Sequence, residues 1–285
     1  MAFKFRRLLD EGAGNPIVAR LGIQAGELLK WSSLDKDKID SINELYVFEL
    51  VPRLINCERA LQQIQSKLRE DIQRVAENSK DNETSFEEPT VIGLQKHAEE
   101  FLYEAKNFLR ELRKLLNLTY ECSFEDAGAF ADLKNKGQSK VVAWAEKQFG
   151  TNDALVDGLR NQKGWIDELV KKRNAVEHPG GLSGSLEIHN AKLTNDKKRV
   201  IPPHWNRTGS DPTNLLDDMS GSVQRLLLLA EHLLADVVRR TLDSDKVEIY
   251  EIPEGRRDPK MPIRLKVSLT PELAKKLAEA EAKKK

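Results

Sequence analysis

Cysteine is scarce in this chain of 285 residues, and the charges of the two signs cancel. The two cysteines, Cys57 and Cys122, lie far apart in helical stretches, which favours small buried side chains over a disulfide framework or a metal site. Lysine plus arginine equals aspartate plus glutamate, at 46 each. A basic field over the whole surface is therefore excluded, and any contact with nucleic acid has to be local.

Long hydrophobic runs are also missing. The most apolar window, Leu226–Val238, is interrupted by Glu231, His232 and Asp236 and is too short to cross a bilayer. Acidic residues and a glycine follow the basic N-terminus at once, so the apolar core of a signal peptide does not develop. We therefore expect a cytoplasmic protein without membrane contact.

What the chain does contain is a helical pattern of apolar residues. Pro52 is expected to kink or divide the helix expected at 37–77, and Gly158 and Gly164 are expected to bend or break the helix expected at 152–177. Apolar side chains recur at three- and four-residue steps over about 37–77, 90–116, 152–177 and 212–242, with shorter stretches at 124–133 and 139–149.

The pattern changes in the C-terminal third. After Gly180–Gly181 the apolar residues alternate, which predicts a β-hairpin inserted at 185–203. Two further strands are expected at 247–252 and 263–269. The predicted fold class is thus mainly α, a helical bundle with a small β-hairpin or sheet addition in the C-terminal third.

Three segments follow from this organisation. We predict an N-terminal segment at 1–36, a helical domain at 37–242 that contains the inserted hairpin, and a β-hairpin with a charged helical tail at 243–285. The sequence assigns no role to the last of these segments.

One segment is a candidate functional motif. It is Arg173–Asn174–Ala175–Val176–Glu177–His178, at the end of a predicted helix. Glycine-rich phosphate loops, Ser or Cys nucleophile motifs and the HExxH zinc motif are absent, so no metal or other cofactor is predicted. On a helical wheel Arg173 falls in the middle of an apolar stripe that includes Ile166 and Val170. An arginine there is unexpected, because a buried guanidinium must be paired.

His178 lies about 140° around the wheel from Arg173, so the two side chains would not converge in a regular helix. Pro179 disfavours helical geometry at residue 178, and Gly180–Gly181 provide a left-handed exit. The helix should therefore end near Glu177 and free His178, whose ring lies within reach of Asn174. A single chain therefore does not obviously assemble a site from Arg173 and His178, and if the motif is catalytic, it is expected to work across a dimer interface.

A structural interpretation fits the same residues. Arg173 and Glu177 form an i,i+4 pair, and a histidine at a helix C-terminus interacts favourably with the helix dipole. Taken from the residues alone, this interpretation is the more common one.

A family resemblance favours the functional interpretation. Arg173–Asn174 followed by His178 at the end of a helix resembles the R-x4–6-H signature of the HEPN superfamily, in which a polar residue, often asparagine, follows the arginine. The resemblance covers about residues 37–242 in architecture but only three residues in motif. It implies a homodimeric α-helical protein. Many members are metal-independent endoribonucleases of toxin–antitoxin, phage-defence and CRISPR-associated systems.

The resemblance also implies roles for these residues. Arg173 and His178 from two subunits would line one cleft, with His178 as general acid or base and Arg173 holding the scissile phosphate. Asn174 would orient His178 or bind phosphate. RNA rather than DNA would be cut, because the 2′-hydroxyl is the nucleophile. One branch of the family carries a tyrosine two residues after the histidine as a modification site, and this chain has Gly180 there.

Basic residues around the motif are candidate RNA contacts. Eight basic residues stand against three acidic ones between Lys171 and Ser210, in a chain that is neutral as a whole. Lys197, Lys198 and Arg199 fit a solvated turn equally well. The candidates are Lys171, Lys172, Lys197, Lys198 and Arg199.

The sequence therefore predicts a HEPN-like endoribonuclease, a toxin or a phage-defence or stress effector, with RNA as substrate. A homodimer is expected, and an antitoxin or another defence-system protein is a candidate partner. The alternative is a non-catalytic helical scaffold that senses RNA or a nucleotide, or that binds another protein.

Overall fold

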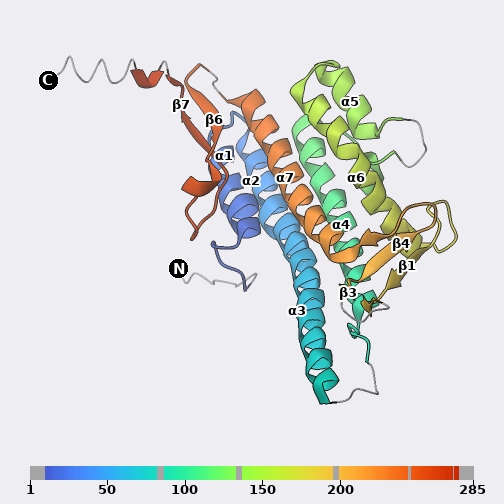
Figure 1. Cartoon of the computed structure of the whole chain (residues 1–285). Helices are drawn as coiled ribbons and strands as arrows, with labels where there is room; N and C mark the ends of the chain where they lie inside the picture. Colours follow the sequence, from blue (N-terminus) through green and yellow to red (C-terminus); the bar gives the residue numbers. More distant parts are fainter. Residues whose placement is uncertain are drawn as a thin grey trace, which may run out of the picture. The chain divides into compact units, whose positions relative to one another are not determined.

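The computed structural model describes residues 10–81, 87–132, 137–194, 199–242, 245–271 and 273–275. The fold is mainly α, with short antiparallel strands in the C-terminal third, as predicted (Figure 1). The chain divides into two compact units. The first comprises Met1–Pro52, Lys114–Phe124 and Leu227–Lys285, and the second comprises Arg53–Arg113 and Glu125–Leu226. The domain boundaries expected after residues 36 and 242 stay predictions.

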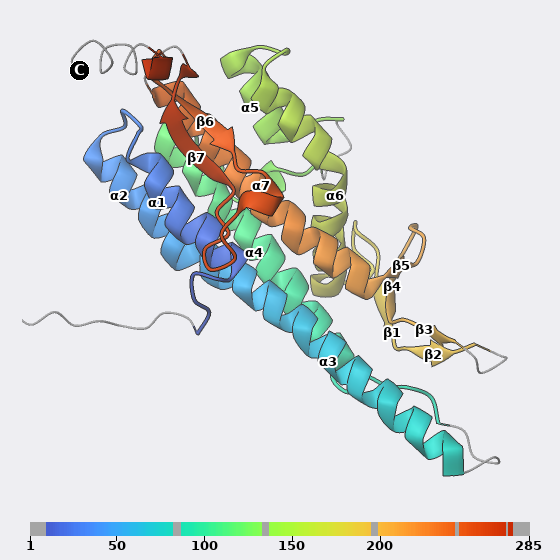
Figure 2. The same cartoon turned by 60° about the vertical axis from the view of Figure 1, so that its left-hand side comes forward.

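Two long helices, α3 (Val51–Asp81) and α4 (Leu94–Tyr120), pair in antiparallel fashion in the second unit (Figure 2). Arg53 Nη1 lies 3.3 Å from Glu104 Oε2, and Lys67 Nζ lies 3.2 Å from His97 Nε2. The apolar stripe of α4 is fully buried, as its three- and four-residue spacing requires. Its buried members include Leu102, Ala105, Phe108, Leu109 and Leu112.

The proline at position 52 does not divide the first long helix. The preceding residues Leu45–Leu50 form a wider π-helical turn, and the N–H of Val51 donates to the carbonyl of Tyr46, five residues back. Proline has no N–H to donate and its ring clashes with the carbonyl four residues before it. The wider turn accommodates both effects, so α2 (Lys36–Glu44), the π-helical turn and α3 follow one another without a break.

Helix α6 (Ala154–Glu177) is uninterrupted, so its glycines do not break it, and the bend expected there stays a prediction. Each helical glycine costs about 1 kcal/mol relative to alanine. Burial of Leu159, Ile166 and Val170 offsets that cost.

The helix expected at 124–133 was also largely wrong, since only the single turn Ala127–Ala129 forms, around Gly128. Helix α5 (Lys140–Phe149) begins as expected, with the Ser139 hydroxyl capping the N–H of Val142 at 3.1 Å.

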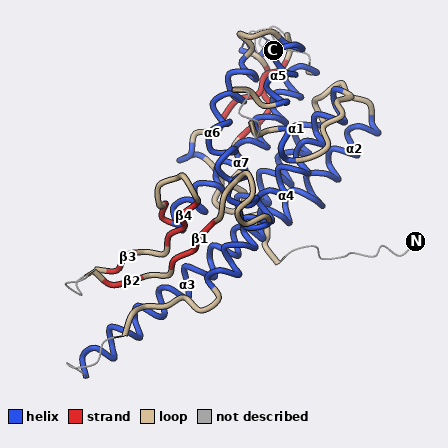
Figure 3. Tube along the Cα trace, turned by 90° about the vertical axis from the view of Figure 1, so that its right-hand side faces the viewer, coloured by secondary structure: helices blue, strands red, loops and turns tan. Residues whose placement is uncertain are grey.

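The predicted β-hairpin is present and longer than a simple pair. Strand β1 (Leu186–His189) pairs with β4 (His204–Arg207), and β2 (Lys192–Leu193) with β3 (Val200–Ile201) continues the same ribbon (Figure 3). A third strand, β5 (Thr213–Asn214), adds to β4 and leads directly into helix α7 (Leu215–Thr241). Residues 195–198, between β2 and β3 in the predicted hairpin, lie outside the described residues.

The first unit contains the second predicted strand pair. Strands β6 (Val247–Glu251) and β7 (Leu265–Leu269) run antiparallel, with Val247 opposite Leu269. Strand β7 packs on helix α1 (Gln24–Leu29), which follows the π-helical segment Val18–Ile23.

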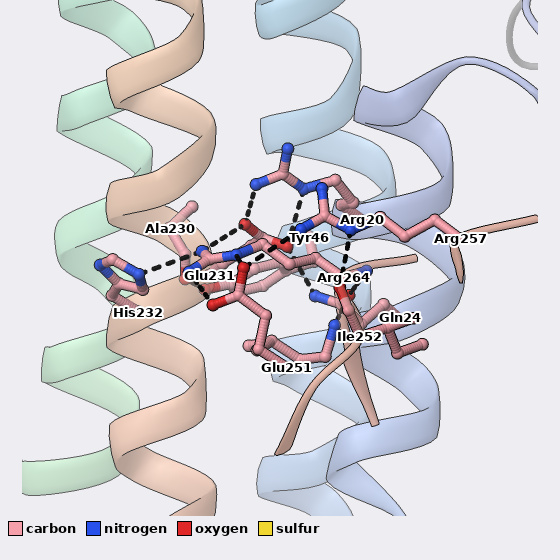
Figure 4. A network of polar contacts seen from close by, with 11 residues as sticks. Arg20, Gln24, Tyr46, Ala230, Glu231, His232, Glu251, Ile252, Arg257 and Arg264 are labelled. Atoms are coloured by element: carbon pink, nitrogen blue, oxygen red, sulfur yellow. Dashed lines mark hydrogen bonds and ion pairs between the residues drawn. The ribbon is translucent and has the colours of Figure 1, made fainter. Parts of the chain in front are cut away.

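A buried ionic network fixes this hairpin in the first unit (Figure 4). The carboxylate of Glu231, on α7, is completely buried and accepts from Arg20 Nε and from Gln24 Nε2, each at 2.8 Å. Arg264, which precedes β7, lies 3.4 Å from the same carboxylate and donates to both oxygens of Glu251 at 2.9 and 2.8 Å. The network satisfies its charges internally, so we interpret it as structural.

Within the described ranges, no helix combines the length and the apolar character that crossing a membrane requires.

Candidate functional site

The end of α6 has the geometry that its sequence predicts. The helix ends at Glu177, and the backbone N–H of His178 still donates to the carbonyl of Asn174 at 2.8 Å. His178 itself leaves helical geometry, with φ −132° and ψ 70°. Its side chain is 72% exposed. Pro179 thus has the predicted effect, and His178 is open to solvent.

The chain beyond His178 closes into a tight turn. Gly180 adopts the predicted left-handed conformation, with φ +76°, whereas the second left-handed residue is Gly184, not Gly181. The N–H of Gly181 donates to the carbonyl of His178 at 3.0 Å, and the N–H of Gly180 to that of Gly184 at 3.1 Å. A Cβ atom on Gly184 would lie 2.5 Å from Thr208, next to the end of β4. The turn after His178 therefore packs closely against the end of β4.

Arg173 lies on the buried side of α6, as the helical wheel predicts. Its side chain is 12% exposed, and its guanidinium stacks over the ring of Tyr103, 4.5 Å from the ring centroid. It also forms the expected ion pair with Glu177. Burial, and to a smaller degree the nearby charge of Arg110, lower the pKa of Arg173, and Tyr103 opposes this shift. The guanidinium thus has one aromatic and one anionic neighbour, while its buried Nε has no hydrogen-bond partner in the part of the chain that the structure describes.

One oxygen atom, Oε2 of Glu177, brings the predicted residues together. It pairs with Arg173 Nη1, and His178 Nε2 lies 3.6 Å from it. The side chains of Arg173 and His178, which a regular helix would keep apart, meet at this carboxylate within one chain. They do so because the helix ends between them. The dimer interface expected for the two residues stays a prediction.

A fourth residue, Lys106 on α4, belongs to the site and was not predicted from the sequence. Its Nζ donates to Asn174 Oδ1 at 2.7 Å and lies 3.9 Å from Glu177 Oε2. Asn174 is therefore bonded to Lys106 rather than to the His178 ring, for which no contact with Asn174 occurs among the described residues. Burial is the largest cause of a lowered pKa at Lys106, and the charge of Arg173 is the next.

A signal for Lys106 exists in the sequence. Tyr103, Lys106 and Arg110 follow one another at three- and four-residue steps and so share one face of α4. Only the tertiary pairing of α4 with α6 shows that this face meets Arg173.

The predicted RNA contacts are dispersed. Lys171 is partly exposed and pairs with Glu168 at 3.7 Å. Lys172 is buried, forms an ion pair with Asp218, and lies 4.9 Å from the Trp205 ring centroid, which gives it a structural partner instead of a free surface position. Arg199 is exposed, where its backbone bonds to Thr194 just before β3. Lys197 and Lys198 lie outside the described residues.

Lys172 also borders a cavity of about 300 Å³, between α6, α7 and the ribbon. This volume is at the lower end of the range for small-molecule pockets. Two tryptophans contribute to its wall, together with residues of both charges. The lining includes Trp165, Lys172, Trp205, Arg207, Asp218 and Arg225.

The part of the chain that the structure describes holds no group of three or more His, Cys, Asp or Glu side chains placed to hold a metal ion. No family model, curated protein or solved structure matches this chain. The function is therefore argued from the site itself.

Proposed function

We propose that the chain is a HEPN-like endoribonuclease that needs no metal and acts through Arg173, Asn174 and His178. The observation that carries the proposal is the meeting of Arg173 and His178 at one anionic oxygen, with the histidine open to solvent. A phosphate placed at that oxygen would contact a guanidinium and an imidazole together. This is the pair of groups that cleavage by the RNA 2′-hydroxyl requires.

The chemistry assigns a separate task to each side chain. The 2′-oxygen attacks the phosphorus, the bond to the 5′-oxygen breaks, and a 2′,3′-cyclic phosphate and a 5′-hydroxyl result. His178 takes the proton of the 2′-hydroxyl or gives one to the leaving 5′-oxygen. Arg173, held over Tyr103, stabilises the charge on the phosphoryl oxygens. Asn174 holds Lys106 at the same position.

The biological setting belongs to the same proposal. A cytoplasmic RNase of this kind would act as a toxin or as a phage-defence or stress effector, under the control of an antitoxin or another defence protein. Two copies of the chain would assemble, so that each cleft receives Arg173 and His178 from both.

A cleavage assay tests the proposal. Purified wild type and His178→Ala are incubated with total RNA in the presence of EDTA, and the products are separated by size. We expect the wild type to cut RNA and the variant to be at least about 100-fold slower, which is the usual contribution of a general acid or base. Equal inactivity of the two proteins, with Arg173→Ala changing only the stability of a dimer, would count against an enzyme.

A second candidate is a non-catalytic protein that senses a nucleotide or RNA. The cavity beside Lys172 favours it, because Trp165 offers a ring surface and Arg225 a cation. In this case nucleotide binding would be lost in Arg225→Ala and kept in His178→Ala.

A further inference from the structure

Two basic side chains and one histidine, from two helices, surround one carboxylate oxygen in the second unit. Lys106 comes from α4, and Arg173 and His178 come from the end of α6. All three lie within ion-pair distance of Glu177 Oε2. An isolated i,i+4 pair would explain the contact of Arg173 alone, but not the approach of Lys106 from another helix.

Positive charge exceeds negative charge at this point. The charge of Arg173 lowers the pKa of Lys106, and Arg110 lowers the pKa of both, while Asp126 opposes the shift at Lys106. Arg110 itself pairs with Glu111, at 3.1 Å. Among the described residues, the Glu177 carboxylate is the anion that both Lys106 and Arg173 contact, and its single charge does not neutralise these two cations.

The position of Glu177 in its helix disfavours the negative charge of its carboxylate. It is the last residue of α6, where the partial negative charge of the helix dipole disfavours an anion. Its side chain is 35% exposed, and that of His178 is 72% exposed, so solvent reaches the cluster. Lys106 and Arg173 hold the carboxylate in place against the dipole.

We propose that Lys106, Arg173 and His178 form a subsite for a phosphoryl group, and that the carboxylate of Glu177 occupies this subsite until the phosphoryl group displaces it. Lys106 is thereby a third phosphate-binding residue. Glu177 is an internal competitor that weakens binding. The subsite rests on the proposed function only in that RNA is the source of the phosphoryl group.

Binding measurements under non-cleaving conditions test the subsite separately from catalysis. The probes are a fluorescently labelled, unstructured 12-nucleotide RNA with 2′-O-methyl groups, the DNA of the same sequence, and sodium phosphate as competitor. Affinity is measured by fluorescence anisotropy over a range of salt concentrations. Circular dichroism and thermal denaturation verify that each variant is folded.

Glu177→Gln is compared with Glu187→Gln, which removes a carboxylate that lies 3.3 Å from a single histidine, His189. We expect Glu177→Gln to bind the RNA and phosphate about three- to tenfold more tightly than the wild type, because the competing charge is gone. Glu187→Gln should bind like the wild type. Equal affinities of the two variants for both probes would overturn the role of Glu177.

Lys106→Ala is compared with Lys96→Ala, which removes an exposed lysine from the same helix. We expect Lys106→Ala to bind several-fold more weakly and to lower the slope of log K against log salt by about 0.7, the value for one lost contact to a single strand. Lys106→Arg should retain the slope. A slope unchanged in Lys106→Ala would overturn the role of Lys106.

Phosphate should compete with the labelled RNA in the wild type and lose this effect in Lys106→Ala. If phosphate binds in this manner and RNA is never cleaved, the subsite stands and the ribonuclease proposal fails. If RNA is cleaved and neither Glu177→Gln nor Lys106→Ala changes binding, the subsite fails and the ribonuclease proposal stands.

Discussion

Arg173 and His178 approach the same atom, Oε2 of Glu177, although they lie five positions apart in the sequence and the helix ends between them. The carboxylate marks a position where an anion is stabilised from two sides. Lys106 adds a third side from α4. This arrangement distinguishes the end of α6 from the ionic network around Glu231, whose carboxylate is completely buried among its partners.

Substitution of Arg173 separates its two contacts. Arg173→Lys keeps the charge but loses the planar guanidinium, which binds phosphate through two parallel hydrogen bonds and stacks on Tyr103. We expect RNA affinity to fall about tenfold, with a loss of about 1 kcal/mol in the free energy of unfolding from the ring contact. Anisotropy and denaturant titration measure the two quantities. Unchanged RNA affinity combined with a loss above about 3 kcal/mol would instead assign Arg173 to the core.

The turn after His178 gives a prediction with an internal control. Gly184 and Gly209 both have φ near +75°, but only Gly184 has a neighbour, Thr208, where a Cβ atom would lie. Gly209→Ala should cost about 1–2 kcal/mol from backbone strain alone. Gly184→Ala should cost about 1–3 kcal/mol more, because Thr208 has to move. Equal losses of thermal stability in the two variants would show that the turn does not pack closely against the end of β4.

The geometry of His178 was predictable because it depends on local chemistry. Pro179 and Gly180 act on their immediate neighbours, so the end of α6 and the release of the histidine follow from the order of residues. The buried position of Arg173 follows from the period of the helix in the same way. The partners of these residues depend on packing. The contact between Asn174 and Lys106 joins residues on two different helices, and local rules do not reach that far.

The errors in the fold have the same origin. The glycines of α6 have a real local cost, but the burial of its apolar face outweighs it, so the helix continues. Pro52 lacks a hydrogen-bond donor as expected, yet the π-helical turn before it removes the need for a break. The pairs β2–β3 and β6–β7 were predictable because alternation is a local pattern too, whereas β4, the partner of β1, lies beyond the predicted hairpin at 185–203.

The network of Figure 4 predicts a large effect for one substitution. Glu231→Gln would leave Arg20 and Arg264 without their buried counter-ion, at a cost of about 3–5 kcal/mol in the free energy of unfolding. Glu27→Gln removes an exposed carboxylate that pairs with Lys30 and should change stability by less than about 0.5 kcal/mol. Chemical denaturation measures both values. Similar values for the two variants would mean that the buried network does not stabilise the first unit.

The same network predicts a pH dependence. Burial lowers the pKa of His232, and the charges of Arg264 and Arg239 add to this, while Glu231 and Glu251 oppose it. The neutral ring accepts a hydrogen bond from Arg264 Nη1 at 3.1 Å. Because the unfolded chain binds the proton more readily, this contribution to stability is complete at neutral pH. It declines as the pH falls through the ordinary range of histidine toward the lowered pKa.

His232→Gln can accept the same hydrogen bond but does not titrate. We expect its melting temperature to fall less than that of the wild type between about pH 7 and pH 5, where histidines protonate. A parallel decline of the two proteins would show that His232 does not contribute to the acid sensitivity.

Analysis of the cleavage products tests the ribonuclease proposal most directly. A 5′-labelled RNA and a matched strand with a single 2′-deoxy residue at the cleaved position are incubated with the wild type in EDTA, and the ends are identified by mass spectrometry. We expect the wild type to leave a 2′,3′-cyclic phosphate on the RNA and not to cut at the deoxy position. His178→Ala should give neither cleavage products nor cyclic-phosphate ends. Intact RNA after prolonged incubation with the folded wild type, or the same products from His178→Ala, would contradict the assignment of Arg173 and His178 as an RNA-cleaving pair.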